Sequence, residues 1–256
     1  MSIVRGISPE TSPKIMLTMS WDDGYPADLR VAELMARYKV KGTFYVPLAN
    51  QEGLPVLSPA SLRELASLHE IGSHTYDHSY LTSLTAKEAE RQIVSGKVAL
   101  EDILGKPVFG FSYPGGKFRH EHVSMVRRAN FHHARCITNC RADLSFDRFK
   151  MPTTLQVYPH TRWVYARHFI RQGDWVRRAS MLPTLMRGHE MLNRLLACVE
   201  FTRRRTSSAA VHFWGHSWEL DRTGGWKVLE EFFQHVSEHP GIVMLQNSEV
   251  AAVVSD

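Results

Sequence analysis

Short apolar runs alternate with helical patterns over almost the whole chain, and this alternation constrains the possible fold more than any other feature. Runs rich in β-branched, aromatic and other apolar residues predict strands at residues 15–21, 42–46, just before His74, 108–113, 209–214 and 241–245. Apolar residues at helical spacing predict helices at residues 27–38, 58–70, 85–104, after Arg119 and at 225–239. Such alternation is typical of a parallel sheet covered by helices, so we expect an α/β fold.

Length and composition indicate one domain. A chain of 256 residues, 43% of them hydrophobic, can bury one sizeable core, and no repeat or linker divides it. We therefore expect a single domain over residues 1–256. The first residues lack the apolar stretch of a secretory signal, and no later segment approaches the ~18 apolar residues of a membrane span. The three cysteines, which we expect to be free thiols, are typical of a reducing compartment, so we expect a cytoplasmic protein.

Chemically reactive side chains follow the expected strands. Asp22 and Asp23 come directly after the first strand, His74 after the third, and His216 two residues after the strand at 209–214. A β/α barrel places its active site at the carboxyl ends of its strands. We therefore expect these side chains to lie together at one end of a barrel.

Two features predict a bound divalent metal. Two adjacent carboxylates at the end of a buried strand repel each other, and a cation would compensate them. His74 and His78 are four residues apart, so on one helical turn both imidazoles would project toward the same point. With Asp23 they make a three-ligand set that leaves a position open for water. We expect zinc, although cobalt or nickel suits the same ligands.

The order of these motifs resembles that of the polysaccharide deacetylase family (NodB homology, similar to carbohydrate esterase family 4). The segment at 20–24, Ser-Trp-Asp-Asp-Gly, is similar to the family's first motif. The resemblance implies that Asp22 is the catalytic base and Asp23 a metal ligand. The second motif, H-[ST]-x-x-H, is matched by His74, Thr75 and His78, which would complete the metal triad.

The family's third motif is matched only in part. The segment at 111–116, Phe-Ser-Tyr-Pro-Gly-Gly, keeps Pro114 and Gly116 but has Ser112 at the position of the family's arginine, which normally positions the base. We expect Lys150 or Arg141 to supply the missing charge. The resemblance further implies that Tyr113, Pro114 and Gly116 bind substrate or the oxyanion, with the backbone N–H of Tyr113 or a neighbour as donor.

The fourth and fifth motifs lie in the second half of the chain. The fourth is poorly matched, and Asp143 and Asp147 are the candidates for a carboxylate that orients the acid histidine. The fifth, an apolar strand that ends in histidine, is similar to residues 211–217. It implies that His216 is the catalytic acid, whereas we expect His212 to be a core residue. The nearby Trp214 and Trp218 are candidates for stacking on a sugar ring.

The resemblance covers roughly residues 15–245 and implies an irregular (β/α) barrel with fewer than eight complete units. It also implies a metal-dependent hydrolase that removes an N-acyl group, most simply acetyl, from an amino sugar in a polysaccharide, oligosaccharide or lipid-linked glycan. In this mechanism Asp22 takes a proton from the attacking water and His216 protonates the departing amine. Two alternatives stay open: an amidase of the same fold acting on a small ureide or formamide, and a carbohydrate-binding pseudoenzyme.

A basic segment suggests an anionic substrate or partner. Residues 162–205 contain ten arginines but only Asp174, Glu190 and Glu200, a net charge of +7. Such a surface attracts an acidic glycan, a lipid-linked sugar phosphate or nucleic acid. The alternative is an ordinary solvated helical face. No nucleic-acid-binding motif accompanies the arginines, so we do not expect nucleic acid to be the partner.

Overall fold

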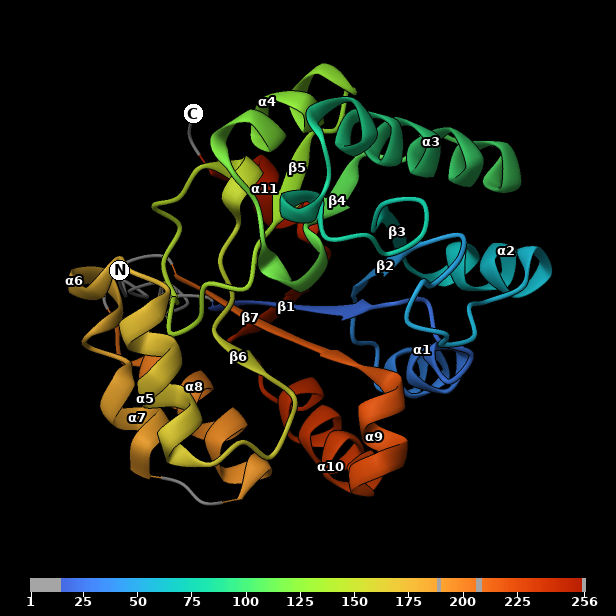
Figure 1. Cartoon of the computed structure of the whole chain (residues 1–256). Helices are drawn as coiled ribbons and strands as arrows, with labels where there is room; N and C mark the ends of the chain where they lie inside the picture. The colour runs from blue at the N-terminus through green and yellow to red at the C-terminus, as the bar shows by residue number, and fades with distance from the viewer. Residues whose placement is uncertain (1–14, 188–189, 206–208, 255–256) are drawn as a thin grey trace, which may run out of the picture.

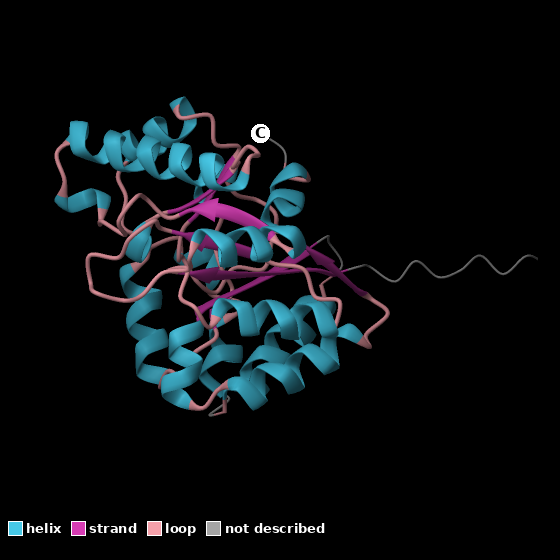
Figure 2. Ribbon diagram, turned by 90° about the vertical axis from the view of Figure 1, so that its right-hand side faces the viewer, coloured by secondary structure: helices cyan, strands magenta, loops and turns pink. Residues whose placement is uncertain are grey.

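The fold is built on one curled parallel sheet surrounded by helices (Figures 1 and 2). The computed structural model describes residues 15–187, 190–205 and 209–254. Its strands are Ile15–Asp22 (β1), Thr43–Val46 (β2), Glu70–Ser73 (β3), Gly110–Ser112 (β4), His133–Arg135 (β5), Leu155–Gln156 (β6), Ala209–His216 (β7) and Ile242–Leu245 (β8). Its α-helices are Asp28–Arg37 (α1), Pro59–Leu68 (α2), Ala86–Leu104 (α3), His120–Arg128 (α4), Arg162–Arg171 (α5), Trp175–Arg178 (α6), Leu182–Arg187 (α7), Met191–Arg203 (α8), Ser217–Thr223 (α9), Trp226–Ser237 (α10) and Asn247–Ala252 (α11).

The strand order β5-β4-β3-β2-β1-β7-β6 places β1 near the centre, with β8 paired to its first half. Every strand pair is parallel, so all carboxyl ends point toward the same end of the barrel. Residues 151–156 connect the two edges of the sheet: the Met151 carbonyl accepts from Cys136 beside β5, and the Thr154 amide donates to His212 in β7. The predicted irregular barrel with incomplete β/α units is therefore confirmed.

Local signals fix the helices of the first half. Ser58 caps α2, with Pro59 in its first turn, as the sequence indicated. Thr85 and Glu88 form a capping box at the start of α3, and Gly105 ends this helix in the left-handed conformation. The predicted elements of the first half and of the carboxyl end are all present, with bounds that differ by at most two residues.

The sequence did not predict the region between β4 and β7 in the same detail. It contains the short strands β5 and β6 and then four helices, α5 to α8, which lie together on one side of the sheet (Figure 1). The three cysteines are free and buried, as expected. Among the described residues, no helix has the length and apolar character to cross a membrane.

Candidate active site

Asp22 and Asp23 lie where β1 ends and the chain turns toward α1. Asp22 is still paired in the sheet, opposite His216 of β7, so these two residues are direct neighbours across two central strands. Asp23 has a φ of 77° and Gly24 a φ of 58°, and both values lie in the left-handed region. A side chain at Gly24 would also clash with Val46, since its Cβ would lie 2.6 Å from Cγ1. The Asp-Asp-Gly sequence therefore makes a sharp turn that leaves both carboxylates buried in the barrel.

His74 and His78 converge as predicted, but not on a helix. Residues 75–77 form a turn after β3, and Thr75 and His78 both have a φ of 65°. The predicted helical turn is therefore wrong, because the chain leaves a strand and reverses within five residues. Gln92 of α3 braces this turn by accepting hydrogen bonds from two of its backbone amides, and the two imidazole rings are 5.0 Å apart between centroids.

The two imidazoles meet the Asp23 carboxylate. Nε2 of His78 is 3.2 Å and Nε2 of His74 is 3.8 Å from Asp23 Oδ1. The Nδ1–H of His74 donates to the Ser112 carbonyl at 2.8 Å, and this hydrogen bond leaves Nε2 as the atom that faces the carboxylate. Burial lowers the pKa of His74 to about 4, so its ring is neutral at neutral pH.

The donor set suits a divalent metal. One ligand atom from each of Asp23, His74 and His78 lies within 4.8 Å of the others, and all three residues are buried. Oδ1 of Asp23 is buried without a hydrogen-bond donor, an arrangement that a cation would satisfy. Two imidazoles and one carboxylate are ligands that zinc prefers in catalytic sites, and the His74–Ser112 hydrogen bond is the outer support that such ligands usually have.

Asp22 is held by an arginine that the sequence did not indicate. Nη2 of Arg135, the last residue of β5, donates to both carboxylate oxygens of Asp22. Both side chains are buried, and the guanidinium group lies between the rings of Tyr45 and Trp214. Burial raises the pKa of Asp22, but the charges of Arg135 and the neighbouring histidines outweigh it and hold this pKa below its ordinary value. Asp22 is therefore an ionised carboxylate.

Arg135 also explains Ser112. The two residues pair directly across β4 and β5, and Nη2 of Arg135 donates to Ser112 Oγ at 2.8 Å. The positive charge that is missing from β4 at Ser112 is therefore supplied by Arg135 of β5. The predicted substitutes are wrong: Arg141 forms ion pairs with Asp143 and Asp174, and Lys150 lies 3.7 Å from Asp147.

His216 has a carboxylate partner in the helix that follows it. Nδ1 of His216 is 2.9 Å from Oε2 of Glu219, which lies in the first turn of α9. Burial lowers the pKa of His216, but the hydrogen bond to Glu219 and the charge of Asp23 raise it to about 9. Gln156 of β6 donates to both oxygens of Glu219 and so fixes its orientation. His216 is therefore protonated at neutral pH.

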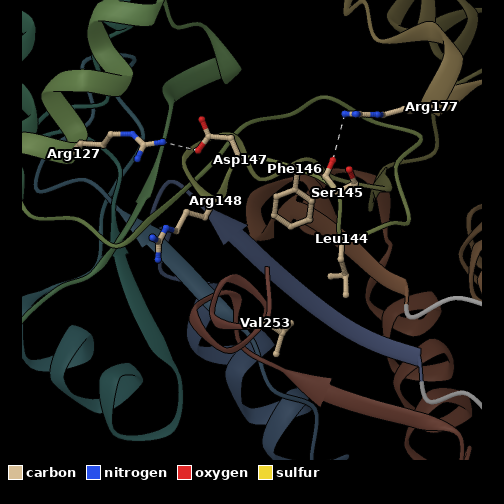
Figure 3. A pocket seen from close by; sticks show the side chains of 8 residues that line it. All are labelled: Arg127, Leu144, Ser145, Phe146, Asp147, Arg148, Arg177 and Val253. Atoms are coloured by element: carbon tan, nitrogen blue, oxygen red, sulfur yellow. Dashed lines mark hydrogen bonds and ion pairs between the residues drawn. The ribbon is translucent and has the colours of Figure 1, made fainter. Parts of the chain in front are cut away.

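Neither predicted orienting carboxylate is near His216. Asp143 pairs with Arg141, and Asp147 pairs with Arg127 at 2.8 Å. Asp147 lines a separate cavity of about 650 Å³ (Figure 3). The other residues of this cavity are Arg127, Leu144, Ser145, Phe146, Arg148, Arg177 and Val253. The predicted carboxylates precede β7 in the sequence, whereas the observed partner, Glu219, follows His216 by three residues.

The residues at 113–116 shape the wall of the site. The Tyr113 amide donates to the Arg135 carbonyl and its hydroxyl donates to the Phe149 carbonyl at 3.0 Å, so neither donor faces the site. The Tyr113 N–H is therefore engaged with Arg135, and the predicted oxyanion role stays a prediction for its neighbours only. Pro114 begins a tight turn, and Gly116 has a φ of 64° and would place a Cβ 2.2 Å from Ile137. This turn therefore packs Gly116 directly against Ile137, which follows β5.

Two tryptophans surround His216, and both contact the polar residues of the site. Trp218 donates from Nε1 to Asp23 Oδ2 at 3.0 Å and stacks on His216 with 5.2 Å between centroids. Trp214 is buried beside Arg135. Trp218 is thus an outer support for a predicted metal ligand, a contact that the sequence did not indicate. His212 lies inside β7, 2.9 Å from Ser20 Oγ, and is a core residue as predicted.

Comparison with known proteins agrees with this geometry. The family model of polysaccharide deacetylase matches residues 9–134. Peptidoglycan-N-acetylglucosamine deacetylases from Listeria monocytogenes and Bacillus cereus are 31% and 30% identical over 101 and 103 residues, which are 38% and 40% of this chain. The matches span only 21% and 46% of those two relatives' own length.

The fold similarity extends over nearly the whole chain. A solved structure from Mycobacterium smegmatis that carries the family's name aligns with a TM-score of 0.68 at 15% identity, covering 99% of this chain and 94% of the other. The sequence matches, together with the first two motifs, identify residues 9–134 with the polysaccharide deacetylase family.

Proposed function

We propose that the protein is a metal-dependent hydrolase that removes an N-acyl group, most simply acetyl, from an amino sugar of a glycan. The observation that carries this proposal is the arrangement of three kinds of group within one buried site. The Asp23, His74 and His78 set suits a metal, Asp22 is ionised beside Arg135, and His216 is protonated beside Glu219. A pseudoenzyme that only binds carbohydrate has no need of both a base and an acid.

The chain's own residues divide the work of hydrolysis. Asp23, His74 and His78 would hold a divalent metal, which would supply Lewis acidity toward the amide carbonyl and lower the pKa of water. Asp22 accepts the proton of the attacking water, and Arg135 keeps it ionised and oriented for this transfer. His216, protonated at neutral pH, donates a proton to the departing amine. Its side chain is 17% exposed, more than those of Asp22 and His74, so it lies on the open side of the site.

The relatives support a glycan substrate, since two of them are named for deacetylation of peptidoglycan N-acetylglucosamine. An amidase acting on a small ureide or formamide would use the same residues and is the second candidate. The cytoplasmic location stays a prediction, and so does the choice of zinc over cobalt or nickel.

The test joins metal content to product release. The purified chain is analysed for bound metal and incubated with N-acetylated oligosaccharides, lipid-linked glycans and small amides, and acetate is measured. We expect about one metal per chain, loss of activity with a chelator and recovery on adding metal. His74→Ala should lose the metal, whereas His122→Ala, which changes another buried histidine outside the triad, should keep it. Equal metal content in both variants would refute the metal assignment, and acetate release only from small amides would select the second candidate.

A further inference from the structure

The first helices of the arginine-rich segment expose an unusual amount of apolar surface. Ten large apolar side chains are exposed in the part of the chain that the structure describes, and four of them lie within residues 163–176. They are Trp163 (69% exposed), Ile170 (67%), Trp175 (57%) and Val176 (92%). Contiguous exposed apolar side chains are uncommon on a protein surface and mark an interaction site.

These side chains form one continuous surface, which we call the α5–α6 face. Trp163, Arg167 and Ile170 are spaced at i, i+4 and i+7, so they lie along one side of α5. Trp175 of α6 donates from Nε1 to the Ile170 carbonyl at 3.2 Å, and this bond joins the start of α6 to the end of that stripe. The opposite side of α5 packs inward through Tyr165, which is buried under Arg194.

The α5–α6 face is also basic, and its cations are not neutralised. It carries three exposed arginines on α5: Arg162, Arg167 and Arg171. Among the described residues no carboxylate forms an ion pair with any of them; Asp174, the acidic residue within this stretch, pairs with the buried Arg141. Of the other arginines in the segment, Arg178 and Arg194 are buried, and Arg203 and Arg204 pair with Glu200. Positive charge without an ion-pair partner therefore lies on the same helix as exposed apolar side chains.

We propose that the α5–α6 face docks the protein on an anionic lipid membrane. Exposed tryptophans beside arginines suit the membrane interface, where the indole ring and the aliphatic side chains enter the headgroup region and the guanidinium groups meet lipid phosphates. Ile170 and Val176 gain nothing from nucleic acid, which offers charge and base stacking but no apolar layer. A second copy of the chain is a poor partner, because a two-fold interface would place these arginines against themselves.

The face begins beside the candidate active site. β6 ends at Gln156, which holds Glu219, and His160 contacts Gln156 at 2.9 Å. Two residues later the chain enters α5, whose first exposed apolar residue is Trp163. The start of α5 is therefore linked, through His160 and Gln156, to Glu219. The inference does not depend on the proposed reaction.

The test is sedimentation of the full chain with vesicles of phosphatidylcholine alone and of phosphatidylcholine mixed with phosphatidylglycerol. We expect binding to the mixed vesicles only, and weaker binding as salt is added. Arg167→Gln should lower the partition coefficient about fivefold, the usual effect of one basic residue at such a surface. Val176→Glu should lower the partition coefficient roughly tenfold or more, since it replaces an exposed apolar side chain that the membrane would bury with a negative charge.

Val98→Glu is the matched control, because Val98 is an exposed valine on α3, outside the face. It should bind mixed vesicles as the wild type does. Binding to both kinds of vesicle alike, or to neither, would overturn the proposal. So would equal binding by Val176→Glu and Val98→Glu. A dimer in analytical ultracentrifugation that Val176→Glu dissociates would assign the face to self-association, and binding of a single-stranded oligonucleotide in place of vesicles would assign it to nucleic acid.

Discussion

Replacing Arg135 by methionine tests the most specific feature of the site, the ion pair that holds Asp22. Methionine keeps an unbranched side chain of similar length between Tyr45 and Trp214 but removes the charge. Two opposite charges about 4 Å apart, in an effective dielectric of about 20, interact by about 4 kcal/mol. Without Arg135, only the charges of the neighbouring histidines would oppose the effect of burial, so the pKa of Asp22 would rise.

The expected result follows from the sign of that shift. The base must be ionised, so a higher pKa of Asp22 moves the acidic limb of the kcat/KM profile to higher pH. Removing one partner of a buried pair should also cost about 3–5 kcal/mol of stability, measured by urea unfolding. The pH profile separates the role in the site from a general loss of stability.

Arg141→Met is the control for that distinction. Arg141 is likewise buried and ion-paired, with Asp143 at 2.7 Å, but it does not contact Asp22. It should lose stability and keep the wild-type pH profile. An exchange variant, Ser112→Arg with Arg135→Ser, would return the charge to the strand that carries it elsewhere in the family and should recover part of the lost activity. An unchanged acidic limb in Arg135→Met would refute the reasoning.

Three further predictions concern other buried carboxyl groups. Burial raises the pKa of Asp28 well above its ordinary value, so the folded protein loses stability as pH rises from the unfolded pKa of this carboxyl toward the folded one. Asp28→Asn should therefore be more stable than the wild type at neutral pH, by about 1.4 kcal/mol for each unit by which the pKa is raised. Urea unfolding should show no gain below about pH 4. Burial raises the pKa of Glu70, but the charge of His133 and the hydrogen bonds that Glu70 accepts hold this pKa below its ordinary value. The stability that Glu70 contributes is therefore present above its unfolded pKa and is lost as pH falls. Glu70→Gln should lose about 1–3 kcal/mol of stability at neutral pH, and its thermal unfolding should depend less on acid pH. Glu219→Gln should lower the pKa of His216 from about 9 and move the basic limb of kcat/KM to lower pH, and an unmoved limb would show that Glu219 does not support the acid.

The parts of the site that the sequence could predict lie next to strand ends within short motifs. Asp22, Asp23 and His216 follow long apolar runs, and the parallel order of the strands is enough to bring their side chains together. The conformation between His74 and His78 was not predictable from spacing, because an HxxxH pair suits a helical turn and this left-handed turn equally well. The hydrogen bonds that Gln92, far along the chain, accepts from the Tyr76 and Asp77 amides support this turn.

Arg135 and Glu219 were missed for different reasons. Glu219 was within reach of a local argument, because a carboxylate three residues after a histidine, in the first turn of a helix, returns to the same side of the chain. Arg135 was not, because its contact with Asp22 spans 113 residues and depends on the register of β5, a three-residue strand without a clear apolar pattern. Once β4 and β5 are paired, the register alone places Arg135 beside Ser112, with both side chains inside the barrel. The general consequence is that an arginine missing from a motif strand should be sought at the paired position of the neighbouring strand before the enzyme is judged inactive.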